Sequence, residues 1–273
     1  DAISFLPDII SLASLLAIFS IFPIICEGIA SPTSQKENNL VKTPHWLSAI
    51  GFSQSISGNS SFNTENLIKE LFKKKLKQIV QIGANDGKRF DILNKFIKKN
   101  KTNSILIEPI KKNYLALEKN YKKCNFVQLE NSAISVNNEI SYLFKVNEKF
   151  LKFYDKHIPG ITSFKKDHLI KHGVSEKHIS KEKVNSLSIK KLFKKYKIKK
   201  LDLLFIDAEG YDGNIVLDFL KMKNFFSIII FEYIHVDNYV LEKVINKLKK
   251  NRYKFFMVNE NLICLPKNRS IVI

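Results

Sequence analysis

The residues with the clearest chemical meaning form a glycine-spaced turn after a short apolar strand. Residues 78–87 read QIVQIGANDG, with Gly83 and Gly87 four positions apart. Glycine has no Cβ, so such a turn lets backbone N–H groups and a helix N-terminus approach a ligand closely. Glu108 lies 25 residues after Gly83, near the roughly 20 expected for an acid that binds a ribose diol. This predicts a nucleoside-type cofactor, and the G-x-x-x-G spacing argues against NAD.

A second set of chemically useful residues follows two later apolar strands. Asp207, Glu209 and Asp212 follow one strand, and Glu232 and His235 follow the next. In an open parallel sheet, ligands bind beyond the carboxyl ends of the strands. We therefore expect these side chains to surround an acceptor pocket beside the cofactor.

The elements that would position these residues alternate between strand and helix. Apolar strands are predicted at Ile79–Ile82, Ser104–Ile107, Asn125–Leu129, Leu201–Ile206 and Phe226–Phe231. Helices are predicted at Thr64–Gln78, Phe90–Lys99, Asn113–Tyr121, Ile189–Tyr196, Asn214–Met222 and Val240–Lys250. This alternation indicates an α/β fold with a mainly parallel sheet and helices on both faces. Tyr253–Val258 and Leu262–Leu265 are predicted to add an antiparallel C-terminal hairpin, which makes a seven-stranded sheet.

A lysine-rich insert from Glu139 to Val184 interrupts the alternation and is expected to cover the pocket. Within it, His168 and His172 are four residues apart and could face one another on a helix as metal ligands. No Cys, Asp or Glu completes a convincing ligand set. We therefore interpret these histidines as part of a solvated basic loop and predict no metal site among them.

The first 62 residues form a separate N-terminal segment, and residues 63–273 form the predicted catalytic domain. Residues 9–26 are an uncharged apolar run of about the minimum length for a membrane span. The run also fits the apolar region of a signal peptide, a buried helix or an artefact of gene assignment. Lysines follow it and aspartates precede it, so the positive-inside rule predicts a cytoplasmic domain, membrane-associated if the run is an anchor.

The charge of the chain comes almost entirely from lysine. The formal net charge is +19, and only Arg89, Arg252 and Arg269 among the 45 basic residues are arginine. Proteins that bind phosphates usually favour arginine for its bidentate geometry. We therefore consider nucleic acid an unlikely partner that the sequence does not exclude. The three cysteines are far apart, which argues against a zinc or disulfide framework.

Five segments together resemble the FkbM family of S-adenosylmethionine-dependent methyltransferases. They read VQIGANDG, ILIEPIKKNYLALEKN, NSAIS, LDLLFIDAEGYD and IIIFEYIH, in the order and spacing of the family. The resemblance covers residues 79–265 and implies a Rossmann-like class I methyltransferase fold. It also implies O-methylation, commonly of sugar hydroxyls in glycans or glycosylated metabolites.

The resemblance assigns roles to individual residues. Glu108 would bind both ribose hydroxyls, and Ser132 and Ala133 would lie beside the adenine. The turn would pass under the methionine part of the cofactor, through Gly83, Ala84, Asn85, Asp86 and Gly87. Gln81 stands where many members carry an acid, so Asn85 or Asp86 is expected to hold the methionine amino group instead.

Three roles remain open for the acids after the fourth strand. Asp207 or His235 could be the general base that takes the hydroxyl proton, with Asp207 also bordering the cofactor. Asp207, Glu209 and Asp212 could instead hold a divalent cation that lowers the pKa of the hydroxyl. Glu209 and Asp212 could also cap the next helix.

Two other functions fit less of the sequence than sugar O-methylation does. An RNA ribose 2′-O-methyltransferase would suit the positive charge. A non-catalytic nucleotide-binding module would keep Gly83, Gly87 and Glu108 but would need no acid at Asp207. The acceptor and the oligomeric state are not predicted.

Overall fold

The computed structural model describes residues 63–73, 75–89, 91–136, 141–155, 157–223 and 225–266. The apolar run at residues 9–26 and the segment up to residue 62 lie outside these ranges, so the domain boundary there stays a prediction. Among the described residues, no helix combines the length and the apolar character needed to cross a membrane.

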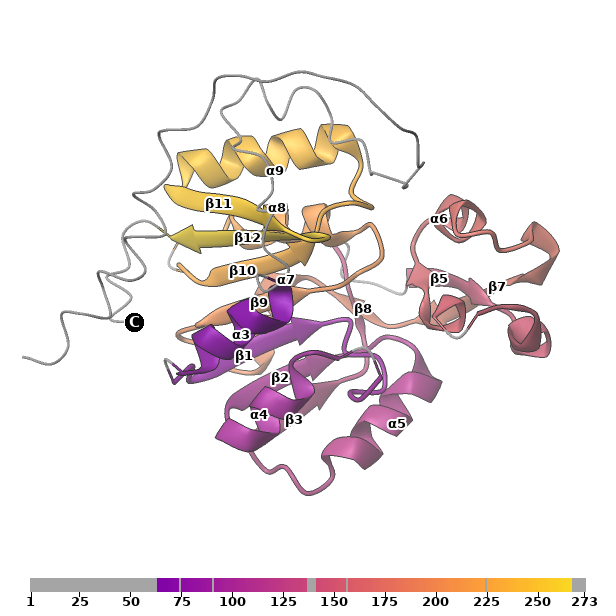
Figure 1. Ribbon diagram of the computed structural model, residues 1–273, viewed down its shortest axis with the longest axis horizontal. Helices are drawn as coiled ribbons and strands as arrows, with labels where there is room; N and C mark the ends of the chain where they lie inside the picture. Colours follow the sequence, from indigo (N-terminus) through magenta and orange to yellow (C-terminus); the bar gives the residue numbers. More distant parts are fainter. Residues whose placement is uncertain are drawn as a thin grey trace, which may run out of the picture. The chain divides into compact units, whose positions relative to one another are not determined.

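A seven-stranded sheet forms the centre of the described part (Figure 1), in the order β11-β12-β10-β9-β1-β2-β3. Its strands are β1 (Gln78–Ile82), β2 (Asn103–Ile107), β3 (Val127–Glu130), β9 (Leu203–Ile206), β10 (Ile228–Glu232), β11 (Tyr253–Val258) and β12 (Asn261–Pro266). The strands from β3 to β10 pair in parallel, and β12 is antiparallel to both β10 and β11. The predicted sheet and its hairpin are confirmed. From β1 the sheet grows through β2 and β3 on one side and through β9 and β10 on the other, so the topological switch point lies between β1 and β9. Such folds bind ligands at this point.

Two groups of helices cover the sheet. The first group is α3 (Thr64–Lys73), α4 (Asn94–Asn100) and α5 (Lys111–Tyr121). The second group is α7 (Ile189–Lys195), α8 (Asp212–Phe219) and α9 (Asn238–Lys250). Phe72 of α3 stacks on Phe96 of α4, with ring centroids 5.2 Å apart, and Asn94 donates to the Tyr121 hydroxyl at 3.0 Å. These contacts hold the first group together.

Strand β1 shows that both faces of the sheet are buried. Val80 and Ile82 belong to the large core that contains the apolar side chains of α7, α8 and α9. Gln81 points to the opposite face, since side chains alternate along a strand. A fully buried aliphatic side chain such as Val80 contributes roughly 1.5–3 kcal/mol. Burial on both faces explains why three of its five residues are isoleucine or valine.

The ends of the predicted helices shift by a few residues, and the largest differences lie in the first two helices. The helix expected at Thr64–Gln78 ends at Lys73, and Gln78 already belongs to β1. The helix expected from Phe90 begins only at Asn94. The Asp91 carboxylate accepts the backbone N–H groups of Leu93 and Asn94 where the helix starts.

The insert forms a small layer of its own beside the strand ends (Figure 1). Its antiparallel sheet has the order β6 (Thr162–Ser163), β5 (Ser141–Val146) and β7 (Ile179–Val184). Helix α6 (Lys166–Lys171) and the 3-10 turns η1 (Glu148–Phe153), η2 (Ile158–Gly160) and η3 (Glu176–His178) complete it. A parallel pair, β4 (Ala133–Ile134) and β8 (Ser186–Leu187), lies where the insert leaves and rejoins the sheet. Val146, Leu169 and Val174 form part of its separate core.

Candidate active site

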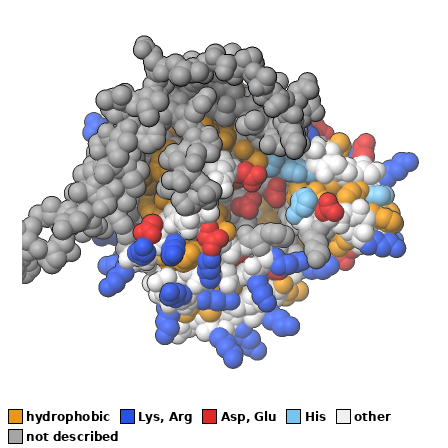
Figure 2. Space-filling view, in the orientation of Figure 1, with side chains coloured by type: hydrophobic (Ala, Val, Ile, Leu, Met, Phe, Trp, Pro, Cys, Tyr) orange, Lys and Arg blue, Asp and Glu red, His pale blue; other side chains and the backbone are white. Residues whose placement is uncertain are grey.

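A cavity of about 630 Å³ opens at the carboxyl ends of β1, β2, β9 and β10. The predicted site residues that line it are Gly83, Ala84, Asn85, Glu108, Ser132, Ala133, Asp207 and Glu209. Gly160, Thr162 and Phe164 also line it, so the insert contributes to the wall, as expected. Figure 2 shows acidic side chains gathered beside histidines on this face.

Gly83 sits where the turn after β1 touches the end of β9. Its φ is +83°, and a Cβ at this position would lie 1.8 Å from the backbone oxygen of Asp207. No other residue fits so close to a neighbouring backbone. Because Gly83 has no side chain, no side-chain atoms of this residue stand between the two strand ends. This is where the sequence predicts the cofactor.

Glu108 is buried with both carboxylate oxygens held in place. One oxygen accepts the backbone N–H of Asn85 and the other that of Ile110, each at 2.9 Å. Burial raises the pKa of Glu108 to about 7, against the lowering effect of these hydrogen bonds. The Asn113 side chain also hydrogen-bonds this carboxylate, so the predicted ribose contact would use the acceptor positions that remain.

Gln81 and Asp91 form a polar pair in the cavity wall that the sequence did not predict. Gln81 Nε2 donates to Asp91 Oδ1 at 3.1 Å. Gln81 Oε1 and Asp91 Oδ2 are buried without a hydrogen-bond partner. Two adjacent buried acceptors without a donor are costly, and a bound ammonium group would satisfy both. The sequence feature that could have revealed this pair is Asp91, an acid ten residues after Gln81 and just before α4.

Asp86 and Gly87 do not line the cavity. The Asp86 carboxylate accepts the backbone N–H groups of Lys88 and Arg89 and pairs with the Arg89 side chain at 2.6 Å. Burial alone would raise the pKa of Asp86, but the interactions with Arg89 and Lys88 lower it. A Cβ on Gly87 would lie 2.4 Å from Leu117 and 2.7 Å from Tyr121. Both residues therefore shape the turn and its packing against α5.

Asp207 directly follows β9 and lines the cavity. Its side chain is accessible to solvent in the cavity, although the residue lies deep in the fold. Burial raises the pKa of Asp207 well above its usual value, and Glu209 and Asp212 raise it further. A carboxylate with a raised pKa is a stronger base than an exposed one. This geometry suits the predicted role of Asp207 as a general base.

Two other acids at the strand ends have different surroundings. Asp212 is fully buried and accepts the backbone N–H groups of Ala208 and Gly210, each at 3.2 Å. It therefore supports the loop before α8, which agrees with the capping role rather than with a cation set built on Asp207. Glu232 lines the cavity, and burial, then Asp207 and Glu209, raise its pKa to about 9.

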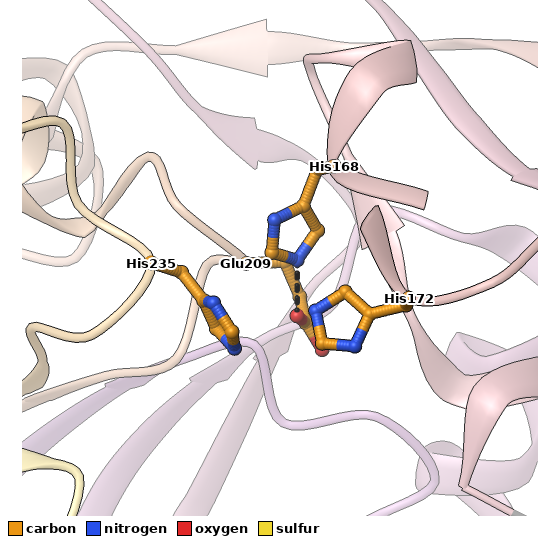
Figure 3. Close-up of side chains that lie close together, drawn as sticks. All are labelled: His168, His172, Glu209 and His235. Carbon is orange, nitrogen blue, oxygen red and sulfur yellow. Dashed lines mark hydrogen bonds and ion pairs between the residues drawn. The ribbon is translucent and has the colours of Figure 1, made fainter. Parts of the chain in front are cut away.

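Glu209 and His235 belong to a cluster with two histidines of the insert (Figure 3). His168 Nε2 lies 2.9 Å from Glu209 Oε2. The rings of His168, His172 and His235 have centroids 4.6 to 4.8 Å apart. Burial, then the neighbouring imidazoles, lower the pKa of His235 to about 4. His235 itself is not part of the cavity wall.

The interpretation of the insert histidines as a solvated loop is wrong for His168. Its side chain is 8% exposed and packs against the strand ends. His172 lies next to it at the end of α6, as the four-residue spacing suggested. Glu209 and His235 were not considered as partners because they lie far away in the sequence. Only the packing of the insert brings the four together.

The fold and the cavity define a Rossmann-like class I methyltransferase. The family model of the methyltransferase FkbM domain matches residues 81–255. The chain belongs to this FkbM methyltransferase family, and the resemblance seen in the sequence is confirmed. No curated protein sequence matches the chain.

Among solved structures, the chain is similar to the FkbM methyltransferase of Methylobacillus flagellatus KT, with 12% identity and a TM-score of 0.42. That match covers 69% of this chain and 43% of the Methylobacillus protein, so the chain spans less than half of it. An O-methyltransferase of Bacillus cereus, solved in complex with SAH, matches with 10% identity and a TM-score of 0.41. This second match covers 80% of this chain and 84% of the other.

Proposed function

We propose that the protein is an S-adenosylmethionine-dependent O-methyltransferase that methylates a hydroxyl of a sugar, a glycan or a related small acceptor. S-adenosylmethionine would supply an electrophilic methyl group on its sulfonium. The protein then has three tasks, which are to bind the cofactor, to align the acceptor hydroxyl and to remove its proton. Each task has candidate residues in the cavity.

The cavity wall fits the cofactor at two separated points. Glu108 offers a buried carboxylate to the ribose hydroxyls, and its oxygens are already oriented by the N–H groups of Asn85 and Ile110. Gln81 Oε1 and Asp91 Oδ2 are buried acceptors that lack a donor, which suits the ammonium group of the methionine. Gly83 lines the same cavity and would leave room for the methionine side chain, whose sulfur is bonded to the ribose.

The acidic lining of the acceptor side carries the proposal of a sugar substrate. Asp207, Glu209, Glu232 and Glu260 all line the cavity. Carboxylates accept hydrogen bonds from sugar hydroxyls, and each such bond is charge-assisted. Those of them that are ionised repel a phosphodiester backbone, which disfavours RNA ribose as the acceptor despite the positive net charge.

Asp207 would act as the general base. Its carboxylate is within the cavity, and its raised pKa favours proton uptake near neutral pH. Glu232, whose pKa is about 9, would be protonated and could donate a hydrogen bond to an acceptor oxygen. Glu209 is engaged by His168 and is therefore the weaker candidate for the base.

The proposal is tested by incubating the protein with S-adenosylmethionine and a panel of neutral glycosides, with an RNA duplex and a single-stranded RNA in parallel. The expected result is S-adenosylhomocysteine formation with glycosides, and a product heavier by one methylene group. Methylation of RNA without any glycoside turnover would refute the sugar acceptor. Failure to bind S-adenosylhomocysteine in calorimetry would refute the enzymatic function altogether.

A further inference from the structure

The cluster of His168, His172, Glu209 and His235 brings four metal-binding groups to one point. Each side chain offers one ligand atom, and these atoms all lie within 4.8 Å of one another. Figure 3 shows the three imidazole rings arranged around the Glu209 carboxylate. The four residues come from three separate segments, namely α6 with its C-terminal cap, the turn after β9 and the turn after β10.

The spacing of the ligand atoms is close to that of a filled tetrahedral site. Ligands 2.0–2.1 Å from a zinc ion at tetrahedral angles are about 3.3 Å apart. The His168 Nε2 to Glu209 Oε2 distance is 2.9 Å, and the other pairs are within 4.8 Å. Rotations of the partly exposed His172 and His235 side chains would bring the four atoms into ligand positions.

The donor types select the kind of metal. Three imidazole nitrogens and one carboxylate oxygen suit a first-row transition metal such as Zn²⁺. Mg²⁺ and Ca²⁺ prefer oxygen ligands, so this set disfavours them. Four protein donors fill the coordination shell of zinc, which is typical of a site that holds structure together rather than one that binds substrate.

The local charge also favours a cation. Asp207 and Glu232 line the same cavity as Glu209, and Asp212 accepts from the backbone of the loop that carries Glu209. Within the described part of the chain, none of these four carboxylates forms an ion pair with a lysine or arginine. A divalent ion at the cluster would offset the charge of Glu209 in this acidic surrounding.

We propose that His168, His172, Glu209 and His235 bind one zinc ion that fixes the insert to the carboxyl ends of β9 and β10. The histidines of α6 supply the insert side, and the Ser163 hydroxyl, which donates to the Glu209 backbone oxygen at 2.8 Å, adds a direct bond nearby. Because Thr162 and Phe164 flank this bond and line the cavity, the ion would hold the acceptor wall in position. The evidence for the zinc site, the geometry of the four ligand atoms, does not rest on the proposed methyl transfer.

The test is the metal content of the full chain, measured by inductively coupled plasma mass spectrometry. The protein is refilled with Zn²⁺ in the presence of excess Mg²⁺ and then dialysed. The expected content is about one zinc ion per chain. H172A and E209Q should each lower it at least about tenfold. H157A, which removes an exposed histidine of the same insert outside the cluster, should keep it.

Two further measurements test the site in the wild type, the second with H172A as its control. Co²⁺ in place of Zn²⁺ should give the visible absorption of a four-coordinate ion, and a chelator should lower the Tm of the wild type but not that of H172A. Zinc content well below one ion per chain after refilling would overturn the proposal. Full zinc retention in both H172A and E209Q would overturn it as well.

Discussion

Gln81 and Asp91 share one hydrogen bond, of 3.1 Å from Gln81 Nε2 to Asp91 Oδ1, and each keeps a second oxygen that is buried without a donor. The pair sits in the cavity wall beside the turn that begins at Gly83. A neutral glutamine thus stands before the glycine, while the negative charge is supplied from the start of the next helix. This arrangement makes Asp91 the candidate partner for a cofactor ammonium group.

Replacing Asp91 with asparagine should therefore weaken cofactor binding selectively. In D91N the oxygen that faces Gln81, Leu93 and Asn94 is kept, but the free acceptor becomes a donor. We expect a loss of about 1.5–3 kcal/mol in S-adenosylhomocysteine binding, as for a hydrogen bond to a charged group. Calorimetry with 5′-methylthioadenosine, which lacks the amino acid part, serves as the control. Equal losses for both ligands would show that Asp91 does not contact the ammonium.

Glu108 should make nucleoside binding depend on pH. Its pKa in the free protein is about 7, chiefly because it is buried. Ribose hydroxyls donate to the ionised carboxylate, so binding lowers this pKa and affinity rises as pH rises through 7. If only the ionised form binds, the affinity for 5′-methylthioadenosine should increase about tenfold from about pH 6 to about pH 8.

The matched variant for this pH effect is E108Q, which keeps the shape of the side chain and removes its titration. We expect E108Q to bind 5′-methylthioadenosine about 1–3 kcal/mol more weakly, with an affinity independent of pH. The ligand has no amine that titrates in this range. A wild-type pH profile that E108Q reproduces would assign the titration to another group and contradict the ribose role.

Asp207 should affect turnover far more than cofactor binding. In D207N the side chain can no longer accept the hydroxyl proton, so we expect the rate of methyl transfer to fall by about 10²–10⁴. S-adenosylhomocysteine affinity should change little, since Asn retains the size and polarity of Asp. D218N is the control, because Asp218 pairs with Lys221 at 3.3 Å and is absent from the cavity wall. A D207N enzyme with wild-type turnover would remove Asp207 from the mechanism.

The strand-end residues could be predicted because a single rule locates them. Once the apolar strands before Gly83, Glu108 and Asp207 are taken as parallel neighbours, their carboxyl ends must meet at one edge. The register confirms this, since Ile82 is the partner of both Ile107 and Ile206. No knowledge of side-chain packing was needed for that part of the site.

The residues that the sequence did not reveal depend on packing over long distances. His168 comes from an insert without a recognisable motif, and its position against Glu209 is set by how that insert docks on the sheet. Asp91 reaches Gln81 only because the segment after the glycine turn bends back toward β1. Hydrophobic periodicity reports which side of an element is buried, but it carries no information on such contacts.

The close approach at Gly83 gives a test of the turn itself. G83A would place a Cβ 1.8 Å from the Asp207 backbone oxygen, at a φ of +83°. Gly173 has nearly the same φ, +81°, and a Cβ added there would have no neighbouring atom within 4 Å, so G173A isolates the cost of the backbone conformation alone. We expect G173A to lower the free energy of unfolding by about 1–2 kcal/mol.

For G83A we expect a loss of at least about 3 kcal/mol, since β1 and β9 must separate in addition. Urea unfolding followed by circular dichroism measures both variants under the same conditions. The difference between them reports the contact between the turn and the end of β9, free of the conformational cost that they share. Equal losses in G83A and G173A would mean that the turn relaxes away from Asp207, and that the floor of the cofactor site is not fixed by this contact.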